Sequence, residues 1–225
     1  MLDRFGVDRS LVQALDIPSG HALIQINRQG QNCIIVSSSA NGAIERNYID
    51  KVLSGFGRGD ILLLQNEISN VGYAMEKAKA AGLKIALNPS PITESLHTYP
   101  LHLVDYFILN EVEGRELSGE EDFAGVLDGL FKLYPGAGIV LTIGSKGVLY
   151  RDSAEFAEHG TYSVPVVDTT AAGDTFCGYF LAGLLEGMPV SKILEFASKA
   201  SSITVSRQGA AVSIPIREEV LAFEG

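Results

Sequence analysis

Short apolar runs alternate with amphipathic segments along most of the chain. Residues 61–64 are wholly apolar, which is typical of a buried strand. Residues 71–81 are rich in alanine and carry apolar side chains at helical spacing, and Gly82 follows where a helix-ending glycine belongs. Residues 83–87 form another apolar run. This stretch therefore predicts a strand, a helix and a second strand.

The alternation continues beyond residue 100. We expect two further strands, at residues 104–109 and 139–143. We expect helices at residues 111–117, 122–133, 173–185 and 190–205, and a short tail at 217–223. Strands that alternate with helices form a mainly parallel sheet covered on both faces. The pattern predicts an α/β fold with three layers, α/β/α, and a Rossmann-like sheet, in one domain that spans residues 1–225.

Two regions depart from this rhythm. Residues 22–27 and 33–37 are β-prone runs separated by a polar loop that contains a glycine, which predicts a hairpin. Residues 148–150 and 162–167 are apolar runs without a helix between them. We expect these two runs to be antiparallel strands at the edge of the sheet.

Composition excludes several classes of protein. The 225 residues are 46% hydrophobic and 20% charged, as in an ordinary globular chain. The formal net charge of −10 makes nucleic acid and anionic lipid surfaces unfavourable partners. A small anion can still bind an acidic protein through a local group of backbone amides. Phosphorylated metabolites therefore remain possible ligands.

The two cysteines and the short length of the apolar stretches indicate a cytoplasmic protein. Cys33 and Cys177 lie far apart and have no metal-ligand spacing, which predicts reduced thiols. The apolar stretch at residues 176–185 is too short to span a bilayer. The first ten residues are charged and lack the apolar core of a signal peptide. We therefore expect a cytoplasmic protein without a membrane segment.

The strongest candidate for chemistry is the segment DTTAAGDTF at residues 168–176, which follows an apolar run and opens a predicted helix. The amides of Ala172, Gly173 and Asp174 would lie at the positive end of the helix dipole, where anions bind. If a phosphoryl group is transferred there, these amides could stabilise its charge and Asp174 could accept a hydroxyl proton. The alternative is that small residues at this turn serve only close packing.

A second candidate is the loop TIGSKG, which follows the strand predicted at residues 139–143. Its glycines, Gly144 and Gly147, would let a phosphate approach the backbone closely. The spacing is not that of a Walker A motif. The alternative is an ordinary tight turn.

Polar side chains also follow two other predicted strands. Asn110 and Glu113 come after residues 104–109, and their spacing suits the orientation of hydrated Mg²⁺ near phosphates. A capping box at the start of the next helix explains the same spacing equally well. Glu67 follows residues 61–64 and is either a site carboxylate or a surface charge.

Several of these segments, in this order, resemble the ribokinase-like (PfkB-type) carbohydrate kinases. The matching segments are GHALIQINRQGQNCIIV, LLLQNEIS, LNPSP, LNEVEGREL, TIGSKGV, DTTAAGDTFCGYF and SRQGAAVSIP, which together cover almost the whole chain. The Ala-Ala-Gly-Asp form of the central motif, with the hairpin sequence, favours the ribose-phosphorylating members over adenosine, fructose and ketodeoxygluconate kinases.

The resemblance implies an enzyme that phosphorylates a sugar hydroxyl with ATP and Mg²⁺. It implies that Asp174 is the catalytic base, and that Ala171, Ala172 and Gly173 form the anion-binding turn. Glu67 would lie near the sugar. The nucleotide site would be lined by Asn110, Thr142, Gly144, Ser145 and Gly147, with Glu113 near the magnesium.

The resemblance also implies activation by a monovalent cation such as K⁺. The matching positions are Asp168, Thr170, Arg207, Gly209 and Ser213. The hairpin, at residues 21–38, would be part of a lid over the sugar that carries the family's dimer contact. The implied partners are a sugar, ATP and either a second copy of the chain or a missing N-terminal segment.

One departure from the family pattern concerns the start of the chain. The family begins with a strand that bears a sugar-binding aspartate and with a GGKGAN-like segment, whereas this chain has no Gly-Gly pair. We therefore expect roughly the first quarter of the usual sequence to be absent. Three hypotheses follow: a kinase that needs the missing segment, a nucleotide-binding protein without kinase activity, or a subunit with a vestigial site.

Overall fold

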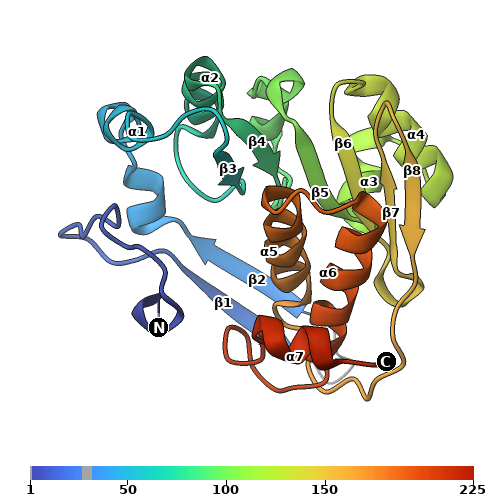
Figure 1. Ribbon diagram of the computed structural model, residues 1–225. Helices are drawn as coiled ribbons and strands as arrows, with labels where there is room; N and C mark the ends of the chain where they lie inside the picture. The colour runs from blue at the N-terminus through green and yellow to red at the C-terminus, as the bar shows by residue number, and fades with distance from the viewer. Residues whose placement is uncertain (1, 27–31) are drawn as a thin grey trace. The chain divides into compact units, whose positions relative to one another are not determined.

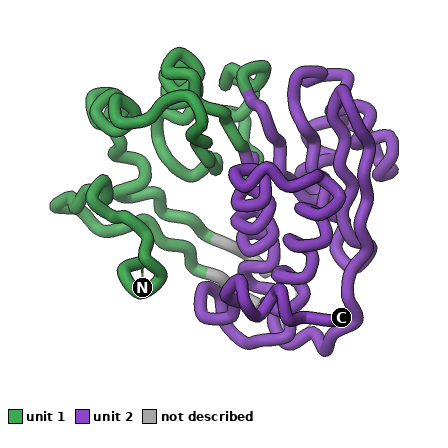
Figure 2. Tube along the Cα trace, viewed as in Figure 1, with its two compact units in different colours: residues 1–86, 90–103 green, residues 87–89, 104–225 purple. Residues whose placement is uncertain are grey.

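The computed structural model describes residues 2–26 and 32–225. Strands β3 to β8 belong to one mainly parallel six-stranded sheet flanked by helices, and β1 and β2 form a separate two-stranded sheet (Figure 1). The predicted α/β class and the separate hairpin are therefore confirmed. The chain divides into two compact units, one of residues 1–86 and 90–103 and the other of residues 87–89 and 104–225 (Figure 2).

The first unit holds the hairpin and the first part of the α/β alternation. Its helical elements are η1 (Leu2–Phe5), η2 (Ser39–Ala43), α1 (Arg46–Leu53), α2 (Val71–Ala81), η3 (Glu94–Thr98) and η4 (Leu101–Leu103). Its strands are β1 (His21–Ile26), β2 (Asn32–Ser37), β3 (Ile61–Leu64) and most of β4 (Lys84–Leu87).

Helix α2 has the bounds that its sequence predicts. It ends at Gly82, which adopts a left-handed conformation with φ of 85° and donates its amide to the carbonyl groups of Ala78 and Lys79. Ala74, Met75 and Ala78 are buried on one face. Helix α1 was not predicted, although its two buried residues, Ile49 and Leu53, lie four apart, as expected on one face of a helix.

The hairpin is antiparallel, with Leu23 opposite Ile35 and Gln25 opposite Cys33. The bounds of both strands agree with the prediction to within one residue. The predicted loop between them, at residues 28–32, lies largely outside the described residues.

The second unit contains the rest of the sheet and the longest helices. Its strands are β5 (Tyr106–Asn110), β6 (Gly138–Thr142), β7 (Val148–Arg151) and β8 (Phe156–His159). Its helical elements are α3 (Glu111–Ser118), α4 (Phe123–Leu133), η5 (Gly144–Lys146), α5 (Ala172–Leu185), α6 (Val190–Val205) and α7 (Arg217–Ala222).

Side chains that alternate along β5 pack against different helices. Tyr106 contacts the ring of Phe180 on α5, with ring centres 6.1 Å apart. The next residue, Phe107, contacts Tyr134 at the end of α4 at 4.6 Å. Because successive strand residues point to opposite faces, α4 and α5 cover the two faces of this part of the sheet. The predicted three-layer arrangement is therefore present within this unit.

The predicted pair of antiparallel strands is half correct. Strand β7 pairs antiparallel with β6, as expected, but its second neighbour is β8 rather than residues 162–167. Residues 162–167 contain no strand. Pro165 lacks the N–H group that a ladder needs, and the amide of Val167 donates instead to the carbonyl of Val205 on α6.

Helices α5 and α6 pack closely against each other. A Cβ on Gly183 would come within 2.9 Å of the Ile193 side chain, so the glycine allows the close approach. Between the helices, the buried hydroxyl of Thr204 donates to that of Thr175 at 3.1 Å. This packing fixes the start of α5 beside the face of α6 that lines the site described below.

Candidate functional site

A cavity of about 580 Å³ opens in the second unit where β5 and β6 end. It is lined by the ends of these strands, by the loop after β6, by the segment after β8, by the first turns of α5 and by one face of α6. Its lining includes all the residues predicted to bind a nucleotide, namely Asn110, Thr142, Gly144, Ser145 and Gly147, together with Ala172 and Gly173 of the predicted anion-binding turn. Residues from three separate sequence motifs therefore meet in one place.

The first turn of α5 presents two backbone N–H groups that find no acceptor among the described residues. Ala171 precedes the helix in a left-handed conformation, with φ of 62°. The amide of Ala172 donates to the Thr169 carbonyl at 3.3 Å, whereas the amides of Gly173 and Asp174 donate to no described residue. Free amides at the positive end of a helix dipole suit an anion.

Asp174 is the third residue of α5, and its side chain is exposed. Its carboxylate forms no hydrogen bond or ion pair with a described residue, so both oxygens are free to accept hydrogen bonds from a ligand. One turn further along the helix, burial and the negative charge of Asp174 raise the pKa of the Cys177 thiol to about 12. Cys177 is therefore an inert core residue rather than a nucleophile.

The loop after β6 is held in one conformation by its glycines and by side-chain hydrogen bonds. Gly147 adopts φ of 104°, and a Cβ at this position would overlap the carbonyl oxygen of His159. The hydroxyl of Thr142 donates to the Leu109 carbonyl at 3.3 Å, and that of Thr161 donates to the Ser145 carbonyl at 2.9 Å. The loop thus forms a fixed wall of the cavity.

Asn110 and Glu113 form the capping box that was the alternative to a metal site. The Asn110 side chain accepts hydrogen bonds from the amides of Val112 and Glu113, at 2.9 and 3.0 Å. The Glu113 carboxylate in turn accepts from the Asn110 amide at 3.0 Å. Asn110 lines the cavity and Glu113 does not. The capping interpretation is therefore correct as local structure.

Two of the residues predicted to bind a monovalent cation, Thr170 and Gly209, contact a third, Asp168. Its carboxylate accepts from the amides of Thr170 and Gly209, at 2.9 and 3.0 Å. Hydrogen bonds from Thr170, and then from the Gly209 amide, hold the pKa of this carboxyl below its usual value. Ser213 is buried and donates to the Ala210 carbonyl at 2.6 Å. The Arg207 guanidinium, by contrast, pairs with Glu219 at 2.6 Å.

Glu67, the predicted sugar-site carboxylate, belongs to the first unit. It is exposed in the turn that follows β3. The neighbouring Asn66 is held firmly, because its side chain donates to the Pro91 carbonyl at 2.7 Å and accepts from the Tyr99 hydroxyl at 2.9 Å. The backbone beside Glu67 is therefore well anchored within this unit.

Two parts of the cavity wall were not predicted. Residues 161–164 and Val166, in the segment after β8, line the cavity, although the sequence suggested a strand there. On α6, the lining residues are Ser198, Ser201, Ser202 and Val205. Their spacing of three and four residues on a predicted helix was the available signal, because it places three hydroxyls on one helix face.

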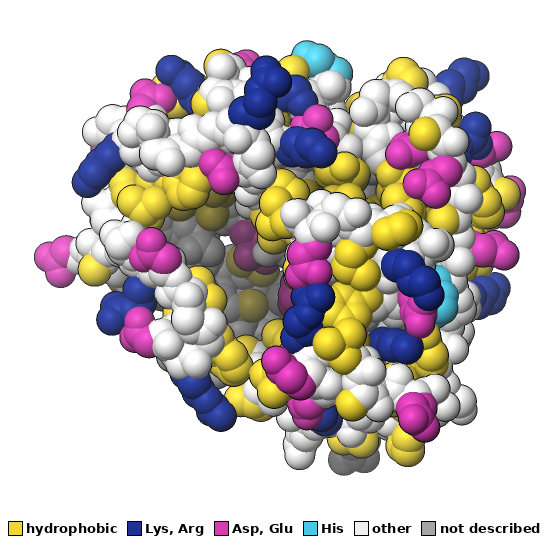
Figure 3. All heavy atoms as spheres, in the orientation of Figure 1, with side chains coloured by type: hydrophobic (Ala, Val, Ile, Leu, Met, Phe, Trp, Pro, Cys, Tyr) yellow, Lys and Arg dark blue, Asp and Glu magenta, His cyan; other side chains and the backbone are white. Residues whose placement is uncertain are grey.

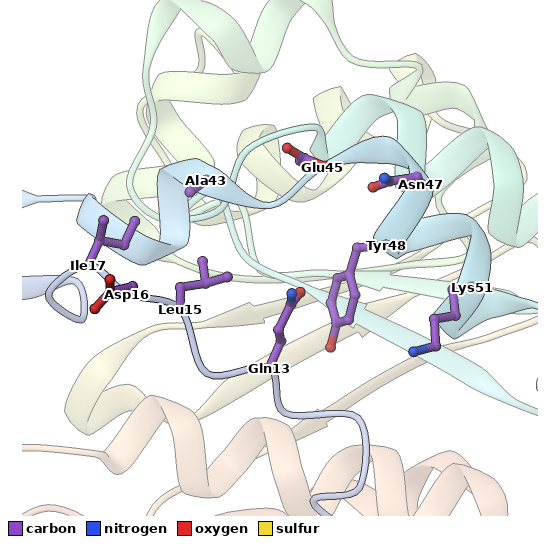
Figure 4. Close-up of a pocket in the computed structure, with 9 residues that line it drawn as sticks. All are labelled: Gln13, Leu15, Asp16, Ile17, Ala43, Glu45, Asn47, Tyr48 and Lys51. Carbon is purple, nitrogen blue, oxygen red and sulfur yellow. The ribbon is translucent and has the colours of Figure 1, made fainter.

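A second cavity, of about 530 Å³, lies in the first unit (Figure 4). One side is formed by the segment before β1, including Gln13, Asp16 and Ile17, and the other by η2 and α1 with Tyr48 and Lys51. The Tyr48 hydroxyl donates to the Leu11 carbonyl. None of the predicted site residues lines this cavity.

Charge is mixed on one face of the molecule. On the face shown in Figure 3, Lys and Arg side chains are interspersed with Asp and Glu rather than gathered in one patch. Every helix in the described part of the chain falls short of the length and apolar character needed to cross a membrane.

Comparison with known proteins agrees with this geometry. The model of the pfkB family carbohydrate kinases matches residues 1–217. A ribokinase of Haemophilus influenzae is 33% identical over 211 residues, which cover 91% of this chain and 69% of that protein. The crystal structure of a Thermotoga maritima ribokinase is 37% identical, with a TM-score of 0.77, and the match covers 92% of this chain and 70% of that one.

A third similar structure contains ligands. The Arabidopsis thaliana ribokinase complexed with ribose and ATP is 29% identical, with a TM-score of 0.76 over 92% of this chain and 69% of that one. Together with the family match, these similarities confirm the resemblance seen in the sequence motifs. The chain belongs to the pfkB family of carbohydrate kinases, which are phosphotransferases that act on a sugar hydroxyl.

Proposed function

We propose that this chain transfers the γ-phosphoryl group of ATP to a primary hydroxyl of D-ribose or a similar sugar. The observation that carries the proposal is the first turn of α5. There, the free amides of Gly173 and Asp174 stand beside a carboxylate that has no partner among the described residues. The similarity to a ribokinase that binds ribose and ATP supports this choice of substrates.

Asp174 is the group we propose as the general base. As the sugar hydroxyl oxygen attacks the γ-phosphorus, its proton passes to a carboxylate oxygen of Asp174. The bond between the γ-phosphorus and the bridging oxygen breaks, and ADP leaves with that oxygen. An exposed carboxylate without a competing hydrogen bond suits this role.

The amides of Gly173 and Asp174 would stabilise the transferred group. Negative charge spreads over the equatorial oxygens of the phosphoryl group in the transition state. Backbone N–H groups that are already oriented need no reorganisation to meet that charge. Ala171 orients them, because its left-handed conformation ends the preceding segment and starts the helix.

Mg²⁺, when bound with the nucleotide, would neutralise charge on the phosphates. Among the described residues, no three His, Cys, Asp or Glu side chains gather to hold a metal ion. This fits Mg²⁺, which is usually held by one or two carboxylates, waters and the substrate phosphates. Asn110 and Glu113 are the residues we propose to orient its waters, and the capping box would fix their side chains.

A monovalent cation such as K⁺ would bind close to Asp168. The hydroxyls of Thr170 and Ser213 and the carbonyl groups of the loop at residues 207–213 are hard oxygen donors, which suit such an ion. The guanidinium of Arg207 is a cation and pairs with Glu219, so Arg207 could contribute only its backbone carbonyl. Glu67 and the hairpin at residues 21–38 are proposed to contact and cover the sugar.

Calorimetric titration tests the proposal. The purified chain is titrated with MgATP, with and without K⁺, and then with D-ribose, while ADP and ribose phosphate are measured. We expect ATP binding that K⁺ strengthens, followed by ADP production that depends on ribose. ATP binding without ribose-dependent ADP would identify a nucleotide-binding protein that lacks kinase activity, and binding of neither ligand would reject the proposal.

A further inference from the structure

The walls of the cavity in the second unit carry almost no charge. Among the described residues that line it, Glu111 is the only charged one, and no Lys, Arg or His side chain joins it. The phosphates of a nucleotide held in this cavity would therefore meet a carboxylate and no cationic side chain of the lining. Such an arrangement leaves negative charge on both sides without a counter-ion.

Glu111 lies where the ends of two strands meet. It is the first residue of α3 and directly follows Asn110 at the end of β5. Strands β5 and β6 are parallel, with Asn110 opposite Thr142. The Oε1 atom of Glu111 lies 3.6 Å from the point where a Cβ on Gly144 would stand. The carboxylate therefore reaches the loop that follows β6.

The two acidic side chains in the first turn of α3 differ in what they contact. The Glu113 carboxylate accepts from the Asn110 amide at 3.0 Å, and Glu113 does not line the cavity. The Glu111 carboxylate forms no hydrogen bond or ion pair with a described residue. The favourable interaction of an acid with the helix dipole applies to both residues, so it does not explain why Glu111 alone lines the cavity.

A free carboxylate beside phosphates affects which form of a nucleotide can bind. Like charges repel, and they repel more strongly in a cavity than in water. A hydrated Mg²⁺ between a carboxylate and phosphate oxygens is attracted to both groups, and Mg²⁺ is usually held by one or two carboxylates together with substrate phosphates. Glu111 thus suits a nucleotide that carries Mg²⁺ and disfavours the metal-free nucleotide.

We propose that Glu111 is a specificity-determining residue, which makes the cavity select the magnesium complex of the nucleotide over the metal-free nucleotide. This inference rests on the proposed function, because it concerns the same cavity and the same nucleotide. It adds Glu111 to Asn110 and Glu113 among the residues that face the hydrated ion. Glu111 supplies the negative charge at the cavity wall, where Glu113 does not reach.

ADP binding with and without magnesium tests the inference without turnover. Calorimetry measures the affinity of the purified chain for ADP in excess Mg²⁺ and in EDTA, at equal ionic strength. We expect the wild-type chain to bind MgADP at least about tenfold more tightly than metal-free ADP. In Glu111→Gln, which keeps the size of the side chain and removes its charge, we expect metal-free ADP to bind more tightly than in wild type. The preference for MgADP should then fall to about threefold or less.

Two further variants complete the test. Glu116→Gln is the matched control, because Glu116 is an exposed acid on the same helix and does not line the cavity. It should keep the wild-type preference, which excludes an effect of net charge alone. Glu113→Gln separates the two first-turn acids, since glutamine can still accept the Asn110 amide in the capping box.

Three outcomes would overturn the inference. Two of them leave the proposed function standing: a wild-type preference in Glu111→Gln, with or without its loss in Glu113→Gln, and equal affinity of the wild-type chain for ADP with and without magnesium. In the third, the wild-type chain binds ADP under neither condition, which would reject the proposed function and the inference with it. Melting temperatures of all variants check that each chain is folded.

Discussion

The backbone amide of Gly209 donates a hydrogen bond to a carboxylate oxygen of Asp168 at 3.0 Å. The other carboxylate oxygen accepts from the amide of Thr170 at 2.9 Å. Asp168 therefore joins the loop that follows α6 to the turn that leads into α5. Because the amides proposed to bind the phosphate lie at the start of α5, this one carboxylate connects the proposed cation site to the proposed phosphate site.

The connection predicts a pH-dependent contribution of Asp168 to stability. The pKa of Asp168 is lowered in the folded chain, chiefly by hydrogen bonds from Thr170. Its contribution to the free energy of unfolding is therefore fully present above the unfolded-state pKa. The contribution is lost as pH falls through the folded-state pKa. We expect Asp168→Ala to lower the melting temperature at pH 7, and the difference from wild type to shrink below about pH 4. Thermal unfolding across this pH range measures the effect.

The control for Asp168 is Glu121→Gln, because the exposed Glu121 carboxylate accepts no hydrogen bond from a described residue. This variant should melt with the wild type at every pH. A constant difference between Asp168→Ala and wild type from pH 7 to pH 3 would contradict the role assigned to the carboxylate.

Gly147 is the residue of the β6 loop where a side chain is least tolerable. Gly147→Ala would place a Cβ against the His159 carbonyl oxygen in a backbone conformation that alanine rarely adopts. We expect a loss of more than about 2 kcal/mol in the free energy of unfolding, measured in urea, together with weaker nucleotide binding. Gly136→Ala is the control, since a Cβ there meets no atom within 4 Å. Equal stability of the two variants would be inconsistent with a fixed loop.

The Cys177 thiol should be unreactive in the folded chain. Its pKa is raised to about 12, so at pH 8 only about one thiol in ten thousand is ionised, and the group is also buried. In a Cys33→Ser variant, which leaves Cys177 as the remaining cysteine, we expect almost no reaction with a thiol reagent under native conditions. Rapid reaction is expected in denaturant, and rapid labelling of the native variant would show that this part of α5 is open.

Tyr162 lines the cavity, and its ring packs against the C-terminal segment of the chain. Phe223 meets its ring edge-on, with ring centres 5.4 Å apart, and His159 lies within 3.2 Å of its hydroxyl. We expect Phe223→Ala to raise the KM for ATP severalfold while kcat stays close to wild type, because the wall of the cavity moves and the reacting groups do not. Steady-state kinetics at saturating ribose separate the two constants.

Leu133→Ala controls for the loss of an exposed apolar side chain away from the cavity, since Leu133 is 56% exposed at the end of α4. It should leave both constants unchanged. A parallel fall of kcat in Phe223→Ala would show instead that the C-terminal segment supports the start of α5.

The sequence specified regular elements wherever local signals were strong. Helix α2 has the predicted bounds because its apolar spacing and Gly82 agree on them. Residues 162–167 were wrongly expected to be a strand, since alternation of apolar side chains says nothing about whether a partner strand is available. The true neighbour of β7 is β8, whose four residues are too short and too polar to give a β signal.

The candidate site was predicted residue by residue where motifs exist. The loop after β6 and the first turn of α5 have distinctive glycines, and the structure brings both to one cavity. The serines of α6 belong to no such motif. A serine on a predicted helix is usually assigned to the surface, so there was no reason in the sequence to place these hydroxyls in a cavity wall. Their burial depends on the packing of α5 against α6, which the sequence alone does not reveal.

The central claim is that Asp174 accepts the proton of the sugar hydroxyl, and Asp174→Asn tests it most directly. The amide keeps the size of the side chain and leaves the backbone N–H groups of α5 in place, but it cannot act as a base. ATP affinity by calorimetry and ribose-dependent ADP production are measured on the same preparation. We predict nearly unchanged ATP affinity with a loss of roughly 10²–10⁴-fold in kcat, and turnover close to wild type would contradict the account.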